Sequence, residues 1–168
     1  RAVFATEQVA RDNHRILGWT LDNYRRNAVV QWAHDTSQPP IAKASGLVAR
    51  GGNLSGAFTF VPEGTCELAD TIAALVRSGY INATSVSWNP IEWKYCTDRN
   101  RPGGIDFSLA DLLEISLVPL PSDPDALIEA RTRGINLDPL ATWAGQALDE
   151  RRNPIPRADL ETFFRAAA

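Results

Sequence analysis

Apolar and polar residues alternate along about the first 120 residues, and this period of two predicts β-strands. The clearest strands are expected over residues 14–19, 27–35, 42–50, 54–61, 81–95 and 112–117. Two glycines and an asparagine fill the short gap at 51–53, a composition typical of a hairpin turn. The pattern therefore predicts a body built mainly of antiparallel β-sheet.

Helical periodicity appears in two parts of the chain. Between residues 66 and 78, apolar side chains recur at helical spacing, which predicts one helix with a core-facing stripe. After residue 121 the composition changes, and three further helices are expected over 125–133, 139–151 and 156–167. We therefore expect an α+β, mostly β protein: a compact antiparallel β-barrel with packed helices at residues 1–121, followed by a helical C-terminal tail at residues 122–168.

Composition narrows the class of protein. The chain has 168 residues, 44% of them hydrophobic, and a formal net charge of −3, and this length allows a sizeable core. Its basic residues are scattered, so it lacks the clustered positive charge of a nucleic-acid-binding protein. No apolar run approaches the roughly 20 residues of a membrane-spanning helix and the start lacks a secretory pattern, which favours a cytoplasmic location. Two cysteines and two histidines form no metal-ligand spacing, so we expect no metal or cofactor.

The most informative chemistry lies in the strand expected over 81–95. Its alternation places Ser85 on a small, polar face. A serine hydroxyl is a weak nucleophile until an imidazole accepts its proton and a third group orients that imidazole. His34, at the end of an earlier strand, and Glu114, inside a later strand, supply these two groups.

Each of these residues also has an ordinary interpretation. A serine in a half-buried strand usually faces solvent, and a lone histidine at a strand end is usually structural. For the third role, Glu114 competes with Asp111 at the entry of the same strand, and a serine–histidine pair without a carboxylate is the remaining alternative. We favour Glu114 because it lies within the strand.

Three segments together carry a more specific signal. They are NAVVQWAHD at 27–35, LVRSGYINATSVSW at 75–88 and LLEISLVPLP at 112–121. In their order and approximate spacing they resemble the prohead (capsid maturation) proteases of HK97-type tailed phages, whose fold is related to that of herpesvirus assemblin proteases. The resemblance covers about residues 9–128 and leaves the rest of the tail outside.

The resemblance implies roles for individual residues. His34 matches the catalytic histidine of the family, Ser85 matches its nucleophile, and Glu114 stands where relatives place their third catalytic residue. In herpesvirus relatives that third residue is a second histidine, but the other histidine here, His14, lies far from the matching strand. Glu114 is therefore the residue expected to orient His34.

The resemblance also suggests how the oxyanion is held. Backbone N–H groups near Ser122 and Asp123 are the expected donors, with Gly103–Gly104 a weaker candidate. The chain departs from the family pattern at two places. Ser87 stands where the pattern usually has glycine, and Ser122-Asp123-Pro124 replaces the more usual Ala-Asn-Pro. Ser87 therefore offers a second hydroxyl that competes with Ser85.

The function implied by the resemblance is that of a serine endopeptidase that cleaves scaffold and major capsid proteins during prohead maturation, with self-processing included. It would work without a cofactor, as a homo-oligomer (a dimer or higher), in the host cytoplasm inside the assembling prohead. The alternative, from a different class, is a catalytically silent β-barrel that serves as a scaffold or interaction module of the capsid. These two hypotheses share a fold and differ in the reactivity of Ser85.

Overall fold

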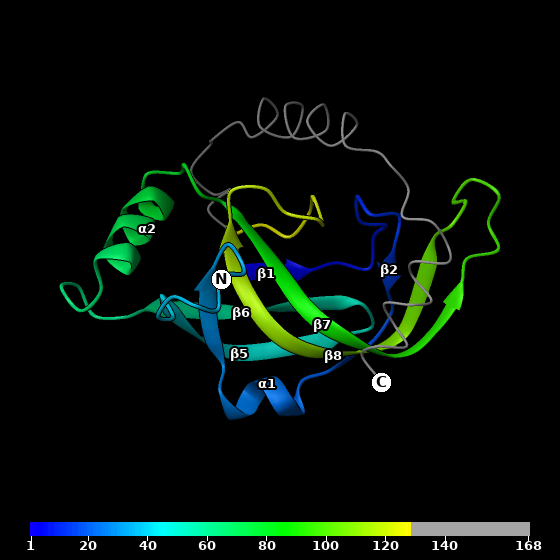
Figure 1. Ribbon diagram of the computed structural model, residues 1–168, viewed down its shortest axis with the longest axis horizontal. Helices are drawn as coiled ribbons and strands as arrows, with labels where there is room; N and C mark the ends of the chain where they lie inside the picture. Colours follow the sequence, from blue (N-terminus) through cyan, green and yellow to red (C-terminus); the bar gives the residue numbers. More distant parts are fainter. Residues whose placement is uncertain (129–168) are drawn as a thin grey trace. The chain divides into compact units, whose positions relative to one another are not determined.

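Strands are the main regular structure of residues 1–128, which are the residues that the structure, a computed structural model, describes (Figure 1). They form one mixed β-sheet that closes into a nearly complete barrel. The strands are β1 (Ala2–Ala5), β2 (Arg15–Ile16), β3 (Trp19–Thr20), β4 (Val29–Trp32), β5 (Ala42–Arg50), β6 (Asn53–Phe60), β7 (Ala83–Tyr95) and β8 (Ile105–Val118), and the helices of this part are α1 (Asp22–Arg26) and α2 (Glu67–Arg77). The mostly β barrel expected from the sequence is therefore confirmed. The helices expected beyond residue 128 lie outside the described residues.

β8 is the central strand of the sheet. β7 pairs with it in antiparallel fashion, with Ser85 opposite Ser116 and Ser87 opposite Glu114. β2, β3 and β4 pair with β8 in parallel, so the sheet is mixed rather than antiparallel throughout. A hairpin turn makes neighbouring strands antiparallel, but β4 and β8 are far apart in the sequence and no turn sets their relative direction.

The remaining wall of the barrel consists of β5, β6 and β1. β5 and β6 form the hairpin that the glycine-rich turn predicted, and Gly51 in this turn has a φ of 59°. This left-handed conformation favours glycine because glycine has no Cβ. β1 pairs with the other side of β6 and so brings the start of the chain toward β7.

Residues 126–128 bridge the gap between β1 and β7. The Val3 N–H donates to Leu127 O and the Thr84 N–H donates to Ala126 O, both at 2.9 Å. Ala126 is fully buried. The barrel thus includes residues beyond the expected boundary of the body. The first helix expected in the tail does not begin where it was predicted, because two of these residues form β-bridges instead.

Strand alternation divides the barrel wall into an inner and an outer face. Val30, Ile115 and Val86 are neighbours on β4, β8 and β7, and they belong to the apolar core or pack against it. The adjacent positions of the same three strands face outward and are polar: Gln31, Ser116 and Ser85. The predicted polar face of β7 therefore lies on the outside of the barrel.

The helix expected over 66–78 is confirmed as α2. Its buried residues Ala69 and Ile72 join the core cluster of the barrel, as the apolar stripe predicted. An apolar side chain of the size of isoleucine contributes roughly 1.5–3 kcal/mol when it is fully buried. This packing attaches α2 to the strands.

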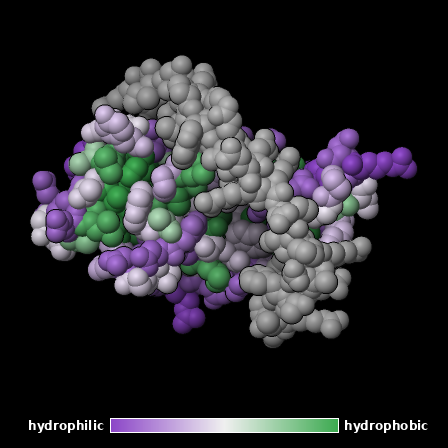
Figure 2. All heavy atoms as spheres, turned by 45° about the horizontal axis from the view of Figure 1, so that its top comes forward, coloured by the Kyte–Doolittle hydropathy of each residue, from purple (hydrophilic) through white to green (hydrophobic). Residues whose placement is uncertain are grey.

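The surface of residues 1–128 is uneven in polarity. Hydrophilic residues cover the projecting end of the β7–β8 hairpin, and the hydrophobic residues visible in this view gather on the opposite side (Figure 2). The hairpin loop exposes Asp98, Arg99 and Asn100. None of the helices in this part of the chain has the length and apolar character that crossing a membrane requires.

Candidate active site

His34 lies just after β4, where the backbone changes direction. Ala33 and His34 both have positive φ values, of 53° and 60°. This left-handed conformation is uncommon outside glycine and costs roughly 1–2 kcal/mol per residue. Ser116 Oγ on β8 accepts a hydrogen bond of 3.0 Å from the His34 N–H. The turn therefore fixes the histidine backbone against the outer face of β8.

Glu114 lies on β8 with both carboxylate oxygens occupied. Its Oε2 is 2.6 Å from Nδ1 of His34. Ser87 Oγ donates to the same oxygen at 3.1 Å, and Ser116 Oγ donates to Oε1. Burying a carboxylate without partners is expensive, so these contacts explain how Glu114 is accommodated with only 9% of its surface exposed.

The contact with Glu114 fixes the tautomer of His34. Nδ1 has a single in-plane position for a proton or a lone pair. Ser87 Oγ lies 3.2 Å from this nitrogen, but the carboxylate at 2.6 Å is the closer and the charged partner. Nδ1 therefore carries the proton and donates it to Glu114, and Ser87 directs its own proton to the carboxylate. Nε2 is then the ring nitrogen that accepts a proton.

Ser85 lies in the next row of the same outer face. It is directly opposite Ser116 on β8, one alternation of β7 away from Ser87, and 8% exposed. Within residues 1–128, the side chain of His34 lies within hydrogen-bond distance of Glu114 and Ser87, and no hydrogen bond joins it to Ser85. The structure thus joins the predicted histidine and glutamate directly and places the predicted nucleophile beside them without a direct hydrogen bond.

A cleft of about 130 Å³ runs beside β7. One wall consists of Ser85, Val86 and Trp88, and residues from the segment 4–16 form the other. The Thr84 N–H points away from β8, because it donates to the bridging segment. Residues two positions apart on a strand direct their backbone groups to the same side, so the N–H and C=O of Val86 also point away from β8. The cleft therefore presents backbone groups of a strand edge next to Ser85.

Ser122 and Asp123, the expected oxyanion donors, also line this cleft. The Asp123 carboxylate accepts hydrogen bonds from the N–H and the hydroxyl of Thr6, at 2.5 and 2.8 Å. Ser122 O accepts one from the Arg11 N–H at 3.0 Å. Gly103–Gly104 lie in the β7–β8 hairpin loop and do not line the cleft. Of the two oxyanion candidates, the structure brings only the first to the cleft that Ser85 lines.

Asp111, the competing carboxylate, lies elsewhere. Its Oδ2 accepts a hydrogen bond of 2.7 Å from Asn23 Nδ2 beside α1. No hydrogen bond joins it to His34 within the described residues. The structure therefore places Glu114, and not Asp111, at the imidazole.

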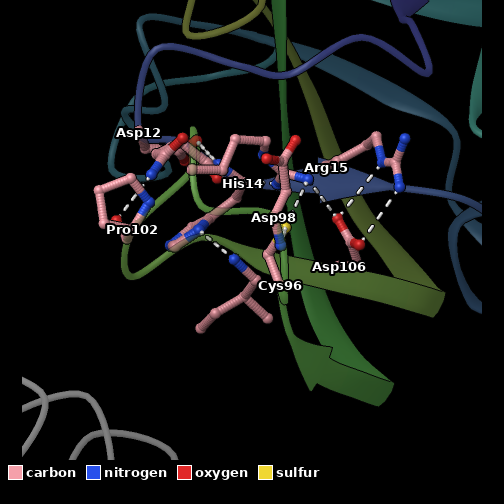
Figure 3. A network of polar contacts seen from close by, with 10 residues as sticks. Asp12, His14, Arg15, Cys96, Asp98, Pro102 and Asp106 are labelled. Carbon is pink, nitrogen blue, oxygen red and sulfur yellow. Dashed lines mark hydrogen bonds and ion pairs between the residues drawn. The ribbon is translucent and has the colours of Figure 1, made fainter.

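The second histidine, His14, belongs to a different polar network, at the base of the β7–β8 hairpin (Figure 3). Its Nδ1 accepts a hydrogen bond of 3.3 Å from the Ile105 N–H. Close by, Arg101 and Arg15 contact Asp106 at 2.8 and 3.2 Å. Burial alone would raise the pKa of Asp106, but hydrogen bonds and positive charge from the two arginines outweigh it and hold that pKa below its ordinary value.

Sequence reasoning missed how Ser116 and Ser87 act on Glu114. The alternation of β8 did place Ser116 on the face of Glu114, which was the available signal. The contact of Ser87 depends on the register between β7 and β8, and this register shifts between Ser87 and Trp88. A bulge of this kind leaves no clear pattern in a single sequence.

Neither a metal centre nor a known relative identifies the site. No group of three or more His, Cys, Asp or Glu side chains among residues 1–128 is arranged to hold a metal ion. In comparisons with known proteins, no family model, curated protein or solved structure matched the chain. The function is therefore argued from the geometry of the site, together with the three sequence segments.

Proposed function

We propose that the protein is a serine endopeptidase in which Ser85 is the nucleophile, His34 the general base and Glu114 the group that orients the imidazole. The observation that carries this proposal is the 2.6 Å contact between His34 Nδ1 and Glu114 Oε2 on the face that Ser85 shares. It leaves Nε2 as the proton acceptor, which is the arrangement that a Ser–His–carboxylate site needs.

In this mechanism, Nε2 of His34 takes the proton of Ser85 as Oγ attacks the scissile carbonyl carbon. The tetrahedral intermediate collapses to an acyl-enzyme when His34 gives that proton to the leaving amine. Water, deprotonated by the same nitrogen, then attacks the acyl carbon, the bond to Ser85 Oγ breaks to release the acid product, and His34 returns the proton to Oγ. Within residues 1–128, Ser85 and His34 have no direct hydrogen bond, so in this mechanism their contact forms as substrate binds, as catalytic contacts often do.

The cleft beside β7 suggests how the substrate is held. An extended peptide that enters it meets the N–H and C=O of Val86, and main-chain hydrogen bonds of this kind add a strand to a sheet edge. The scissile carbonyl would then lie at Ser85. Backbone N–H groups near Ser122 and Asp123, on the same cleft, would stabilise the oxyanion.

The biological setting rests on the resemblance of three sequence segments to prohead proteases. It assigns scaffold and major capsid proteins as substrates, the assembling prohead in the host cytoplasm as the location, and a homo-oligomer as the working form. The strand-edge cleft is compatible with such substrates because it recognises an extended main chain rather than a small molecule.

The second candidate is a catalytically silent barrel that acts as a scaffold or interaction module. The missing hydrogen bond between Ser85 and His34 in the described residues favours it. In that case the cleft would bind an extended segment of a partner without cleaving it.

A serine-directed fluorophosphonate reagent separates the two candidates. We expect one reagent mass to be added per chain, on the peptide that contains Ser85, with no labelling in Ser85→Ala. The matched control is Ser87→Ala, which removes the neighbouring hydroxyl and should still be labelled. No labelling of the folded parent would support the silent barrel, and labelling at Ser87 would show that the nucleophile is the other serine of this face.

A further inference from the structure

We propose that Ser87 is a positioning residue of the site: its hydroxyl shares the carboxylate oxygen of Glu114 that binds His34, and so weakens the hold of that oxygen on a protonated imidazole. The proposal concerns the side chain that departs from the family pattern, and the proposed protease activity does not assign it a role. Its catalytic consequence rests on the proposed function, whereas its electrostatic effect does not.

The geometry leaves Ser87 one place for its proton. Ser87 Oγ is 3.1 Å from Glu114 Oε2 and 3.2 Å from His34 Nδ1, and those two atoms are already joined at 2.6 Å. Since Nδ1 gives its proton to Oε2, it has no lone pair for Ser87. The hydroxyl proton therefore goes to Oε2. The pairing of Ser87 opposite Glu114 in the β7–β8 ladder keeps the hydroxyl there.

The other oxygen of the carboxylate is also occupied. Ser116 Oγ donates to Oε1, and its lone pair accepts the His34 N–H at 3.0 Å. Each oxygen of Glu114 thus accepts one serine proton, and Oε2 alone also accepts the imidazole N–H. Ser87 is the donor that competes directly with the histidine for Oε2.

The competition between Ser87 and His34 for Oε2 affects protonated His34 in a predictable direction. A carboxylate stabilises the charged form of a neighbouring imidazole and raises its pKa, and a donor to that carboxylate disperses part of the negative charge. Removing the Ser87 hydroxyl should therefore strengthen the attraction between Glu114 and protonated His34.

Other ionisable groups near His34 do not reverse this sign. Asp35 follows His34 in the chain, but its carboxylate is exposed and accepts hydrogen bonds from Ser37. Tyr24 on α1 also interacts with Glu114: burial first, and then the charge of Glu114, raise the pKa of Tyr24 far above its usual range, so the phenol stays neutral. On β4 and β7 the residues of this face are neutral. Glu114 is therefore the anion that acts on His34, and Ser87 changes the strength of that effect.

The consequence for catalysis follows from the role of the base. Only a neutral imidazole can accept the Ser85 proton, so the acidic limb of kcat/KM follows the pKa of His34. By weakening the hold of Oε2 on the protonated imidazole, Ser87 favours the neutral form of the histidine, which is the active form. A chain with alanine at this position would need a higher pH to reach the same rate.

The test is an NMR titration of the imidazole signals in the full chain, which contains two histidines, His14 and His34. His34→Gln assigns the signals. In Ser87→Ala we expect the His34 midpoint to rise by roughly 0.5–1 pH unit, a shift that corresponds to about 0.7–1.4 kcal/mol. Ser87→Thr, which keeps the hydroxyl, should restore the parent midpoint. The matched control is Ser108→Ala, an exposed serine elsewhere on β8, and His14 serves as the internal reference.

An unchanged or lowered His34 midpoint in folded Ser87→Ala would overturn the proposal. If that variant does not fold, Ser87→Gly replaces it, and the same rise is required. Fluorophosphonate labelling of the same samples keeps the two proposals distinguishable. If Ser85 is labelled but the His34 midpoint does not move, the role of Ser87 is refuted and the proposed protease activity is retained. If the midpoint rises but Ser85 is not labelled, the protease activity is refuted and the role of Ser87 is retained.

Discussion

The three contacts of Glu114 make this carboxylate the residue on which the site depends. One oxygen binds His34 and Ser87, and the other binds Ser116. A neutral amide in its place has only one acceptor oxygen and presents an NH₂ group to partners that are donors themselves. Replacing Glu114 should therefore affect the tautomer of His34 more than the packing of β8.

We expect Glu114→Gln to slow fluorophosphonate labelling of Ser85 by about three to four orders of magnitude, comparable with serine proteases in which the orienting carboxylate becomes an amide. Asp111→Asn is the control, since Asp111 contacts Asn23 rather than the histidine. Its labelling rate should stay close to that of the parent. Equal rates in both variants, or a greater loss in Asp111→Asn, would remove Glu114 from the mechanism.

For individual residues, the sequence indicated which side chains matter in the site, but it said less about which of them are in contact. The position of His34 at a strand end and of Glu114 within a strand predicted their pairing, and the structure joins them. The link from Ser87 to Glu114 could not be predicted, because it requires the cross-strand register and the shift that follows Ser87. Ser85 stays a predicted nucleophile, supported by its face and by the cleft.

Among the elements, the base of the β7–β8 hairpin is held by charge as well as by the ladder. Arg101 and Arg15 both contact Asp106, whose side chain is only 9% exposed. The pKa of Asp106 is lower in the folded protein than in the unfolded chain, where it is near 4. The charged carboxylate therefore stabilises the fold above about pH 4, and this contribution is lost as the pH falls through the pKa of Asp106 in the folded protein.

Asp106→Asn should therefore lower the free energy of unfolding by about 2–3 kcal/mol at pH 7, because two arginines lose a buried anionic partner. Near pH 3 the difference from the parent should shrink, because Asp106 of the unfolded parent, with an ordinary pKa near 4, is then largely protonated. Urea unfolding of both proteins at the two pH values measures this. A difference that is constant with pH would show that the ion pairs contribute nothing through charge.

Predictability also differed among the elements. The β5–β6 hairpin and α2 follow from local signals, a glycine-rich turn and a helical apolar stripe, and both were predicted close to their observed bounds. β2 and β3 have two residues each, too few to show any alternation. The parallel direction of β4 beside β8 is set by barrel closure, a long-range property that no local pattern contains.

For the described part of the molecule as a whole, closure of the barrel depends on residues 126–128. Ala126 is fully buried between strands, and its carbonyl accepts hydrogen bonds from Thr84. A charged side chain here has neither space nor a partner. The segment should therefore be as sensitive to substitution as the core itself.

We expect Ala126→Asp in the full chain to lower the free energy of unfolding by about 3 kcal/mol or more, because a buried charge is left without a partner. Asp125→Ala, at the exposed neighbouring position, should change it by less than about 1 kcal/mol. Thermal unfolding followed by circular dichroism compares the two. Similar stabilities for both variants would mean that the bridge between β1 and β7 adds little.

The central place of β8 has a consequence for how the protein is made. The strands that pair with it in parallel all precede it by about 70 residues or more, and β8 itself contains Glu114. Until the ribosome has synthesised β8, the edges of β2, β3 and β4 that pair with β8 have no partner, and such non-local pairing makes folding slow. The nascent chain therefore depends on protection from aggregation until β8 emerges. For the same reason, a chain released before β8 has neither a closed barrel nor the carboxylate that orients the imidazole, so premature products of translation should be inert.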